Sequence, residues 1–195
     1  MNLIPLVQGL ALSYASGVST YATIALLGLA ERAGWIGPLP GSLGVVSEWW
    51  MIVPALVLFA FELAALVIPG IATLWETVHT AIRPPAAAAL AVMTAWGGDP
   101  TMVAGVGLIG GMIGLTTSAT KLGLRAAVDT SPEPVSNTAF TAAELGVVAS
   151  VTFFVWHHPV VTLVAAMALL VLTLLLVRAA WRAIRRLFTR AVAPA

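Results

Sequence analysis

Two glutamates, Glu62 and Glu144, lie inside long apolar stretches of the sequence. A carboxylate within a membrane is costly, so an acid in such a position usually has a partner and a function. Either residue could carry a coupling proton or bind a cation. The structural alternative is an acid that is protonated or hydrogen-bonded and only joins two helices.

A second polar group has helical spacing. Glu76, His79 and Arg83 are three and four residues apart, which places them on one face of a helix. This face predicts either a binding site or an amphipathic turn at the membrane interface.

Lys121 and Arg125 are also one helical turn apart, at the end of an apolar stretch. They suit a helix C-terminus, and a plain membrane anchor is the alternative reading. The proline-containing stretch that follows, with Glu133, leads to a predicted helix start at Asn137. A capped helix start beside two cations could hold an anionic headgroup or a phosphate, or it could be a rigid turn.

These polar groups are predicted to converge on one region of the cytoplasmic side. The predicted substrate- or ion-binding residues are Glu62, Glu76, His79, Arg83, Lys121, Arg125, Glu133, Asn137 and Glu144.

The composition indicates a membrane protein. Of 195 residues, 60% are hydrophobic and 9% charged, whereas soluble domains carry about 25% charged residues. A net charge of +1 argues against a nucleic-acid partner. The absence of cysteine excludes disulfides and thiol catalysis. No nucleotide loop or catalytic constellation is present, and the adjacent His157 and His158 would bind metal poorly, so neither a cofactor nor a metal is expected.

The apolar stretches predict an all-α bundle of about six membrane spans, each needing about 20 residues. Residues 1–182 form the predicted membrane domain, and 183–195 a basic cytoplasmic tail. Pro84 and Pro85 interrupt the third stretch, which is either a kinked span or a re-entrant helix pair. The predicted spans are 3–30, 49–68, 71–96, 101–121, 137–156 and 159–181.

The basic residues predict the orientation. With six spans, eight of the nine lysines and arginines fall on one side and only Arg32 on the other. We therefore expect both termini in the cytoplasm, in a bacterial inner membrane. The arginines around and beyond Trp181 are expected to bind anionic lipid.

An internal repeat is suspected. Residues 17–23 match 114–120 at four of seven positions, and small residues recur four apart on both segments. Halves 3–96 and 101–182 would then be inverted copies, as in many secondary transporters. Chance matching of common residues is the alternative. The small residues predicted to pack helices, within the chain, in a homodimer or against another membrane protein, are Ser13, Gly17, Gly107, Gly110, Gly111 and Gly114.

Three motifs together resemble a known family. They are Trp75-Glu76-x-x-His79-x-x-x-Arg83-Pro84, Lys121-x-x-x-Arg125 and Ser131-Pro132-Glu133-Pro134-x-Ser136-Asn137. The chain is similar over nearly its whole length to the bacterial membrane proteins grouped as domain of unknown function 4126. The resemblance implies a membrane fold and no established activity.

The chain departs from this family at several positions. Relatives tend to carry Asp and Lys around the Ile-Pro-Gly turn, near Leu66, Val67 and Ala72 here, and often His at Ser118. Any role of those groups in proton or ion handling is therefore not carried over.

Two functions fit the pattern. The first is a small secondary transporter, channel or lipid-headgroup translocator, with Lys121 and Arg125 meeting the substrate and Glu62 and Glu144 providing coupling. The second is a membrane scaffold or accessory subunit that binds other helices through its glycine-rich faces. An enzyme acting on lipid lacks a recognisable catalytic group.

Overall fold

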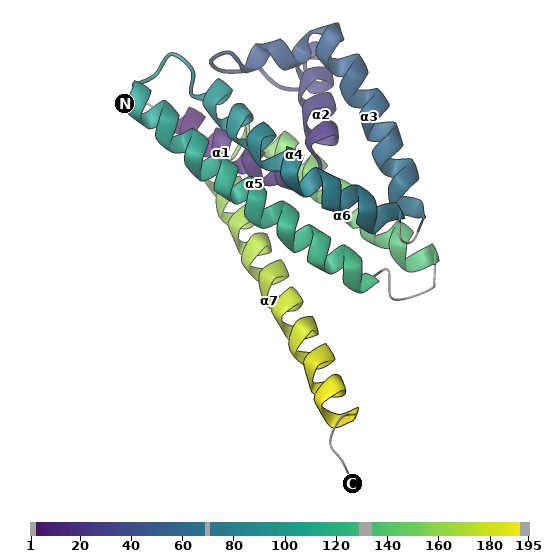
Figure 1. Cartoon of the computed structure of the whole chain (residues 1–195). Coiled ribbons are helices and arrows are strands. Elements are labelled where there is room, and N and C mark those ends of the chain that lie inside the picture. Colours follow the sequence, from purple (N-terminus) through teal and green to yellow (C-terminus); the bar gives the residue numbers. More distant parts are fainter. Residues whose placement is uncertain (1–2, 69–70, 129–133, 192–195) are drawn as a thin grey trace.

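Helices make up almost all of the chain that the computed structural model describes, which is residues 3–68, 71–128 and 134–191 (Figure 1). This part contains no strand, so the predicted all-α class is confirmed. Its elements are α1 (Ile4–Val18), α2 (Thr20–Arg32), the 3₁₀ helix η1 (Leu43–Ser47), α3 (Trp49–Val67), α4 (Ile71–Thr94), α5 (Pro100–Val128), α6 (Pro134–Phe154) and α7 (Pro159–Ala191).

Three of these helices are long and apolar enough to cross a membrane. The qualifying segments lie in α3, α5 and α7, at Trp49–Leu66, Pro100–Ala126 and Pro159–Ala179. Large apolar side chains stand exposed along them, including Leu108 and Val161. Water would not tolerate apolar surface on this scale, whereas lipid does. The chain is thus a membrane protein built from helices.

Helix α1 lies at the centre of the bundle. It contacts α2, α4, α5, α6 and α7, and ten of its fifteen residues are buried. Helix α7 packs against α1 and α5, and its C-terminal part extends away from the other helices (Figure 1).

The predicted first span was wrong as a single helix. The helix ends at Val18 and a second begins at Thr20, because Ser19 is extended, with φ −151° and ψ 105°. The Ser19 hydroxyl accepts a hydrogen bond from the Ala22 N–H at 3.3 Å, which is the usual way a serine caps a helix start. The central helical segment is therefore discontinuous.

The prolines act differently from expectation in α4. This helix runs without interruption through Pro84 and Pro85, so the re-entrant pair predicted as one alternative is wrong. Elsewhere, Pro100, Pro134 and Pro159 each stand first in their helices, where the missing N–H costs nothing.

Three predicted boundaries also shift. Helix α5 continues past Lys121 to Val128, and α6 begins at Pro134 rather than at Asn137. Helix α7 continues to Ala191, so most of the predicted tail belongs to that helix.

Glycines allow α1, α4 and α5 to pack closely. A Cβ on Gly114 would collide with the Cβ of Ala87, and one on Gly110 would lie 2.7 Å from the Cβ of Ala91. Gly107 and Gly111 meet α4 in the same way, and a Cβ on Gly17 would lie 3.1 Å from the Cα of Gly114. Along this stretch α4 and α5 run side by side (Figure 1). These glycines are used for packing within one chain.

Replacing Gly114 with alanine should therefore destabilise the protein by about 1–3 kcal/mol, because the added methyl overpacks the α4–α5 contact. The matched control is Gly105→Ala in the same helix, where no atom of another helix lies within 4 Å of the added Cβ. The free energy of unfolding in mixed micelles measures both. Equal stability of the two variants would show that α4 and α5 do not approach as closely as described.

Candidate functional site

Six charged side chains meet in the interior of the bundle and form what we call the ion-pair network. Their side chains are between 0 and 10% exposed. The network consists of Glu62 on α3, Glu76 and Arg83 on α4, Lys121 and Arg125 on α5, and Glu144 on α6.

Arg83 joins two of the acids. Its Nη2 donates to Glu62 Oε1 at 2.8 Å and to Glu76 Oε1 at 3.1 Å, and its Nη1 donates to Glu76 Oε2. Glu76 and Arg83 are seven residues apart, or two turns of α4, so both point from one face of the helix. The contact of Arg83 with Glu62 links α4 to α3.

Lys121 connects this pair to the rest of the network. Its Nζ lies 2.9 Å from Glu76 Oε1, 3.4 Å from Glu144 Oε2 and 3.7 Å from Glu62 Oε1. It also donates to the backbone carbonyl of Val18 at 2.8 Å. Val18 is the last residue of α1, and carbonyls at a helix C-terminus lack intrahelical partners and attract cations. The break between α1 and α2 thus supplies one of the hydrogen-bond acceptors of Lys121.

Ser19 also takes part, although it is not among the binding residues predicted from the sequence. Its hydroxyl donates to Glu62 Oε2 at 2.5 Å while accepting the capping hydrogen bond from α2. The available signal was a serine within a repeated motif of small and hydroxyl residues. Helical periodicity alone could not show that its backbone is extended.

The far end of the network is less completely paired. Arg125 Nη2 donates to Glu144 Oε2 at 2.8 Å and to Thr141 Oγ1 at 3.3 Å, and its guanidinium lies over the Phe140 ring at 4.7 Å. Arg125 Nε, Arg125 Nη1 and Glu144 Oε1 are buried without a hydrogen-bond partner in the described structure. Such groups are uncommon in protein interiors and need an explanation.

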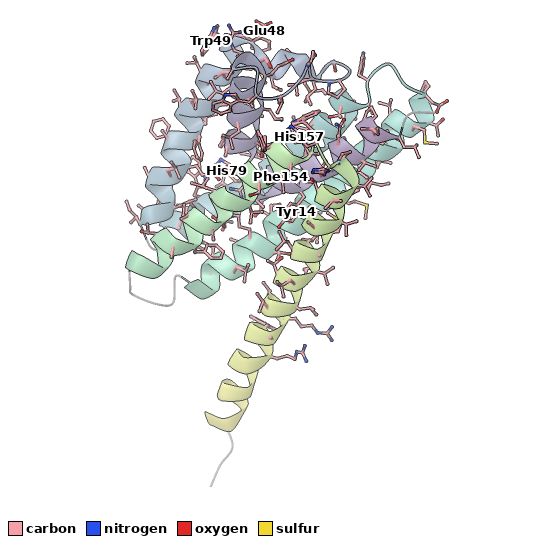
Figure 2. All side chains as sticks on the ribbon, turned by 180° about the vertical axis from the view of Figure 1, so that it is seen from behind. Tyr14, Glu48, Trp49, His79, Phe154 and His157 are labelled. Carbon is pink, nitrogen blue, oxygen red and sulfur yellow. The ribbon has the colours of Figure 1, made fainter. Side chains whose placement is uncertain are left out.

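His79 lies beside the network but not in it. Its Nε2 is 3.0 Å from the Tyr21 hydroxyl, its Nδ1 is 2.8 Å from the Trp75 carbonyl, and its ring stacks on Trp75. Figure 2 shows His79 within the bundle, away from Glu48 and Trp49 at its end. Glu76, His79 and Arg83 are all buried, so this face is not an interfacial turn.

Two predicted residues are not placed with the others. Glu133 lies outside the described residues, as does most of the loop before α6. The backbone of Asn137 belongs to α6, but its side chain lies outside what is described. Their proposed part in binding stays a prediction.

A cavity of about 160 Å³ adjoins the incompletely paired end of the network. It lies between α1, α5, α6 and α7, and Lys121 and Glu144 form its charged part. Tyr14, which lines it from α1, lies within the bundle (Figure 2). The lining residues are Tyr14, Val18, Thr117, Thr120, Lys121, Leu124, Phe140, Ala143, Glu144, Val147 and Thr173.

The network holds three acids and three bases, so it is neutral when all six are ionised. Neutrality matters because an unpaired charge in a low-dielectric interior costs several kcal/mol. The pairing also links four helices to the break between α1 and α2. Addition of a proton or an anion at this site would therefore require the remaining pairs to rearrange.

The fold and this site define a membrane protein with a buried, charge-balanced ion-pair network. Its sequence matches the model of the family described as Domain of unknown function (DUF4126) over residues 6–179, so the chain belongs to that family. This confirms the resemblance carried by the three motifs. No curated protein and no solved structure matches the chain. The geometry of the site is therefore what indicates a function.

Removal of one base should expose the cost of an unbalanced charge. We expect Arg83→Met to lower the free energy of unfolding by about 3–5 kcal/mol, because Glu62 and Glu76 lose the guanidinium that pairs with both. Adding Glu76→Gln to this variant should restore part of the loss, since it removes the surplus negative charge.

The control for both variants is Arg178→Met, which removes an exposed arginine from α7. Unfolding with a denaturing detergent in mixed micelles gives the free energies of the unaltered protein and of the three variants. Equal stability of Arg83→Met and Arg178→Met would contradict a cost of unbalanced charge.

Proposed function

We propose that this protein is a small secondary transporter of the bacterial inner membrane, with the ion-pair network as its coupling site. The observation that carries the proposal is the burial of six balanced charges beside a broken helix. In secondary transporters, substrate and coupling-ion sites commonly lie where helices are discontinuous, near the middle of the membrane. Channel and lipid-headgroup translocation are the neighbouring possibilities that the test separates.

A purely structural role explains the network less well. Buried ion pairs are often no more stabilising than apolar residues of the same size, because desolvation offsets the attraction. Six charged residues are therefore a costly way to hold helices that already pack through glycines. A site that must bind and release a charge needs ionisable groups. Such a role would explain why six charged residues are buried despite their desolvation cost.

We further propose six crossings, with α1 and α2 together forming the first and α3 to α7 the others. Halves 3–96 and 101–182 would be inverted copies. The contact between Gly17 and Gly114 supports this arrangement, because equivalent residues near a twofold axis meet each other. Both termini would be cytoplasmic, with the arginines of 183–195 on anionic lipid.

Protonation is the proposed coupling event. A proton on one of the three carboxylates leaves the network with an excess positive charge, so the ion pairs around Lys121 must redistribute. Lys121 bridges all three acids and the end of α1, so its movement is transmitted to the helix break. Opening toward one face and then the other would follow from this redistribution.

The scaffold hypothesis is less well supported, because it needs the glycine-rich faces to be free for a partner. The glycine-rich faces that would bind a partner are occupied by α1, α4 and α5 of the same chain. A homodimer through Gly110 and Gly114 is disfavoured for the same reason. A partner would have to bind elsewhere, on side chains that otherwise face lipid.

Access to the cavity from the two sides of the membrane tests transport without knowledge of the substrate. The chain has no cysteine, so Thr117→Cys introduces a single thiol at the cavity. In proteoliposomes, a membrane-impermeant maleimide applied to either face should label this thiol. Lowering the pH should change the ratio of the two labelling rates, and the ratio cancels the ionisation of the thiol itself.

Gly37→Cys and Arg182→Cys, on exposed positions of the proposed outer and inner sides, report labelling of one face each. Adding Glu144→Gln to Thr117→Cys should fix the ratio at all pH values, whereas Glu48→Gln, at an exposed acid, should not. Labelling from a single face at every pH would contradict transport. Labelling from both faces with an unchanging ratio would instead indicate a channel.

A further inference from the structure

The cavity next to Lys121 has hydrogen-bonding capacity that the protein does not use. Thr117 Oγ1 and Glu144 Oε1 have no partner in the described structure, although Thr117 is 4% exposed and the Glu144 side chain 10%. Both residues line the cavity. Buried polar atoms of this kind mark a place for a bound group or water.

Most of the rest of the wall is apolar. Tyr14, Leu124, Phe140 and Val147 contribute rings and aliphatic side chains. A closed cavity of roughly 150 Å³ accommodates a molecule the size of benzene, and this cavity measures about 160 Å³. Its volume and its lining residues suit a small molecule with one polar head and an aliphatic body of roughly six carbons.

The charges around the cavity favour an anionic head. Glu144 already lies 3.4 Å from Lys121 Nζ and 2.8 Å from Arg125 Nη2. A cationic ligand at Glu144 would stand beside both bases and be repelled. A carboxylate could accept from Lys121 and from Thr117, and its charge would be balanced if Glu144 took up a proton.

We propose that the cavity binds the carboxylate of an aliphatic acid, which replaces Glu144 as the counter-ion of Lys121 and Arg125. One proton enters with each carboxylate and resides on Glu144, so the site is neutral before and after binding. This inference rests on the proposed function, for which it names the substrate class and the coupling ion.

The other helices around Glu144 offer no competing proton site in the described structure. The acids on α3 and α4 are held by Arg83 and Ser19, and α2 directs Tyr21 to His79. Helix α7 lines the cavity with Thr173. The ionisable groups that face Glu144 or connect to it are Tyr14 on α1, Glu62 on α3, Glu76 and Arg83 on α4, and Lys121 and Arg125 on α5.

The ligand could come from either of two sources. A short-chain acid would enter from water, and a fatty acid would enter from the bilayer past Ala143, which is exposed at the rim of the cavity. Both present the same carboxylate to Lys121.

Equilibrium binding of labelled hexanoate to the full chain in lipid nanodiscs tests the proposal at about pH 6 and about pH 8, where the ligand stays ionised. Because binding requires a proton on Glu144, affinity should rise as pH falls, by about tenfold per pH unit while free Glu144 is ionised. Glu144→Gln should bind equally well at both pH values. The source of the ligand is tested by competition, with palmitate added to the nanodisc lipid or unlabelled hexanoate added to the water. Stronger displacement of the labelled hexanoate by palmitate would identify the bilayer as the source. Weaker displacement by palmitate would identify water.

Two cavity variants check the location. Thr117→Val should weaken binding roughly tenfold, because it removes one hydrogen bond to a charged group, and Val147→Phe should abolish binding by filling the cavity. Glu48→Gln, at an exposed acid, should bind as the unaltered protein does.

The proposal is overturned if neither the unaltered protein nor Glu144→Gln binds hexanoate at the lower pH, or if Glu144→Gln keeps the pH dependence. Access of Thr117→Cys from both faces without hexanoate binding would sink this inference and leave the transporter. Binding of hexanoate together with labelling of Thr117→Cys from one face only would contradict the transporter and leave this inference standing.

Discussion

Charge neutrality inside the helical bundle is the constraint on which the rest of the structure depends. Three acids and three bases are buried on α3, α4, α5 and α6, and none can lose its partners without leaving a charge in a medium that solvates it poorly. The constraint explains why helices far apart in sequence must converge here. It also explains why a backbone carbonyl and a serine hydroxyl, from Val18 and Ser19, are drawn into the same site. Close packing through glycine brings α1, α4 and α5 near enough for short side-chain contacts to form.

The two copies of the small-and-hydroxyl motif show how tertiary partners decide local structure. In α5, the Thr116 hydroxyl donates to the Met112 carbonyl one turn back, and the helix continues. The equivalent hydroxyl, on Ser19, donates to Glu62 and caps α2 instead, and the helix breaks. Hydroxyl side chains can bond to their own helix or compete with it, so the sequence is compatible with both outcomes. The neighbouring acid makes the difference.

Part of the fold and of the site could be predicted from the sequence, and part depends on contacts between helices. Charged residues within apolar segments predict a shared site, because buried charges must pair, and six of the nine residues singled out from the sequence do meet. The all-helical class follows from composition. The break at Ser19 involves a contact with Glu62 on another helix, which local patterns do not contain, and those patterns do not predict that α4 continues through Pro84. Gly110 and Gly114 indicate close helix approach, but spacing cannot tell whether the neighbouring helix belongs to the same chain.

The uneven pairing across the network indicates which part of it changes state. Around Arg83, both oxygens of Glu62 and Glu76 are engaged, so this end resists any change of charge. Around Arg125, two donors and one carboxylate oxygen have no partner among the described residues, and Glu144, which carries that oxygen, lines a cavity. A network built only for rigidity would have no reason to leave a carboxylate oxygen unused beside a cavity, since an unpaired buried acceptor costs free energy. The well-paired end therefore holds α3 and α4 in place, while the Glu144 end retains the capacity to exchange one partner for another.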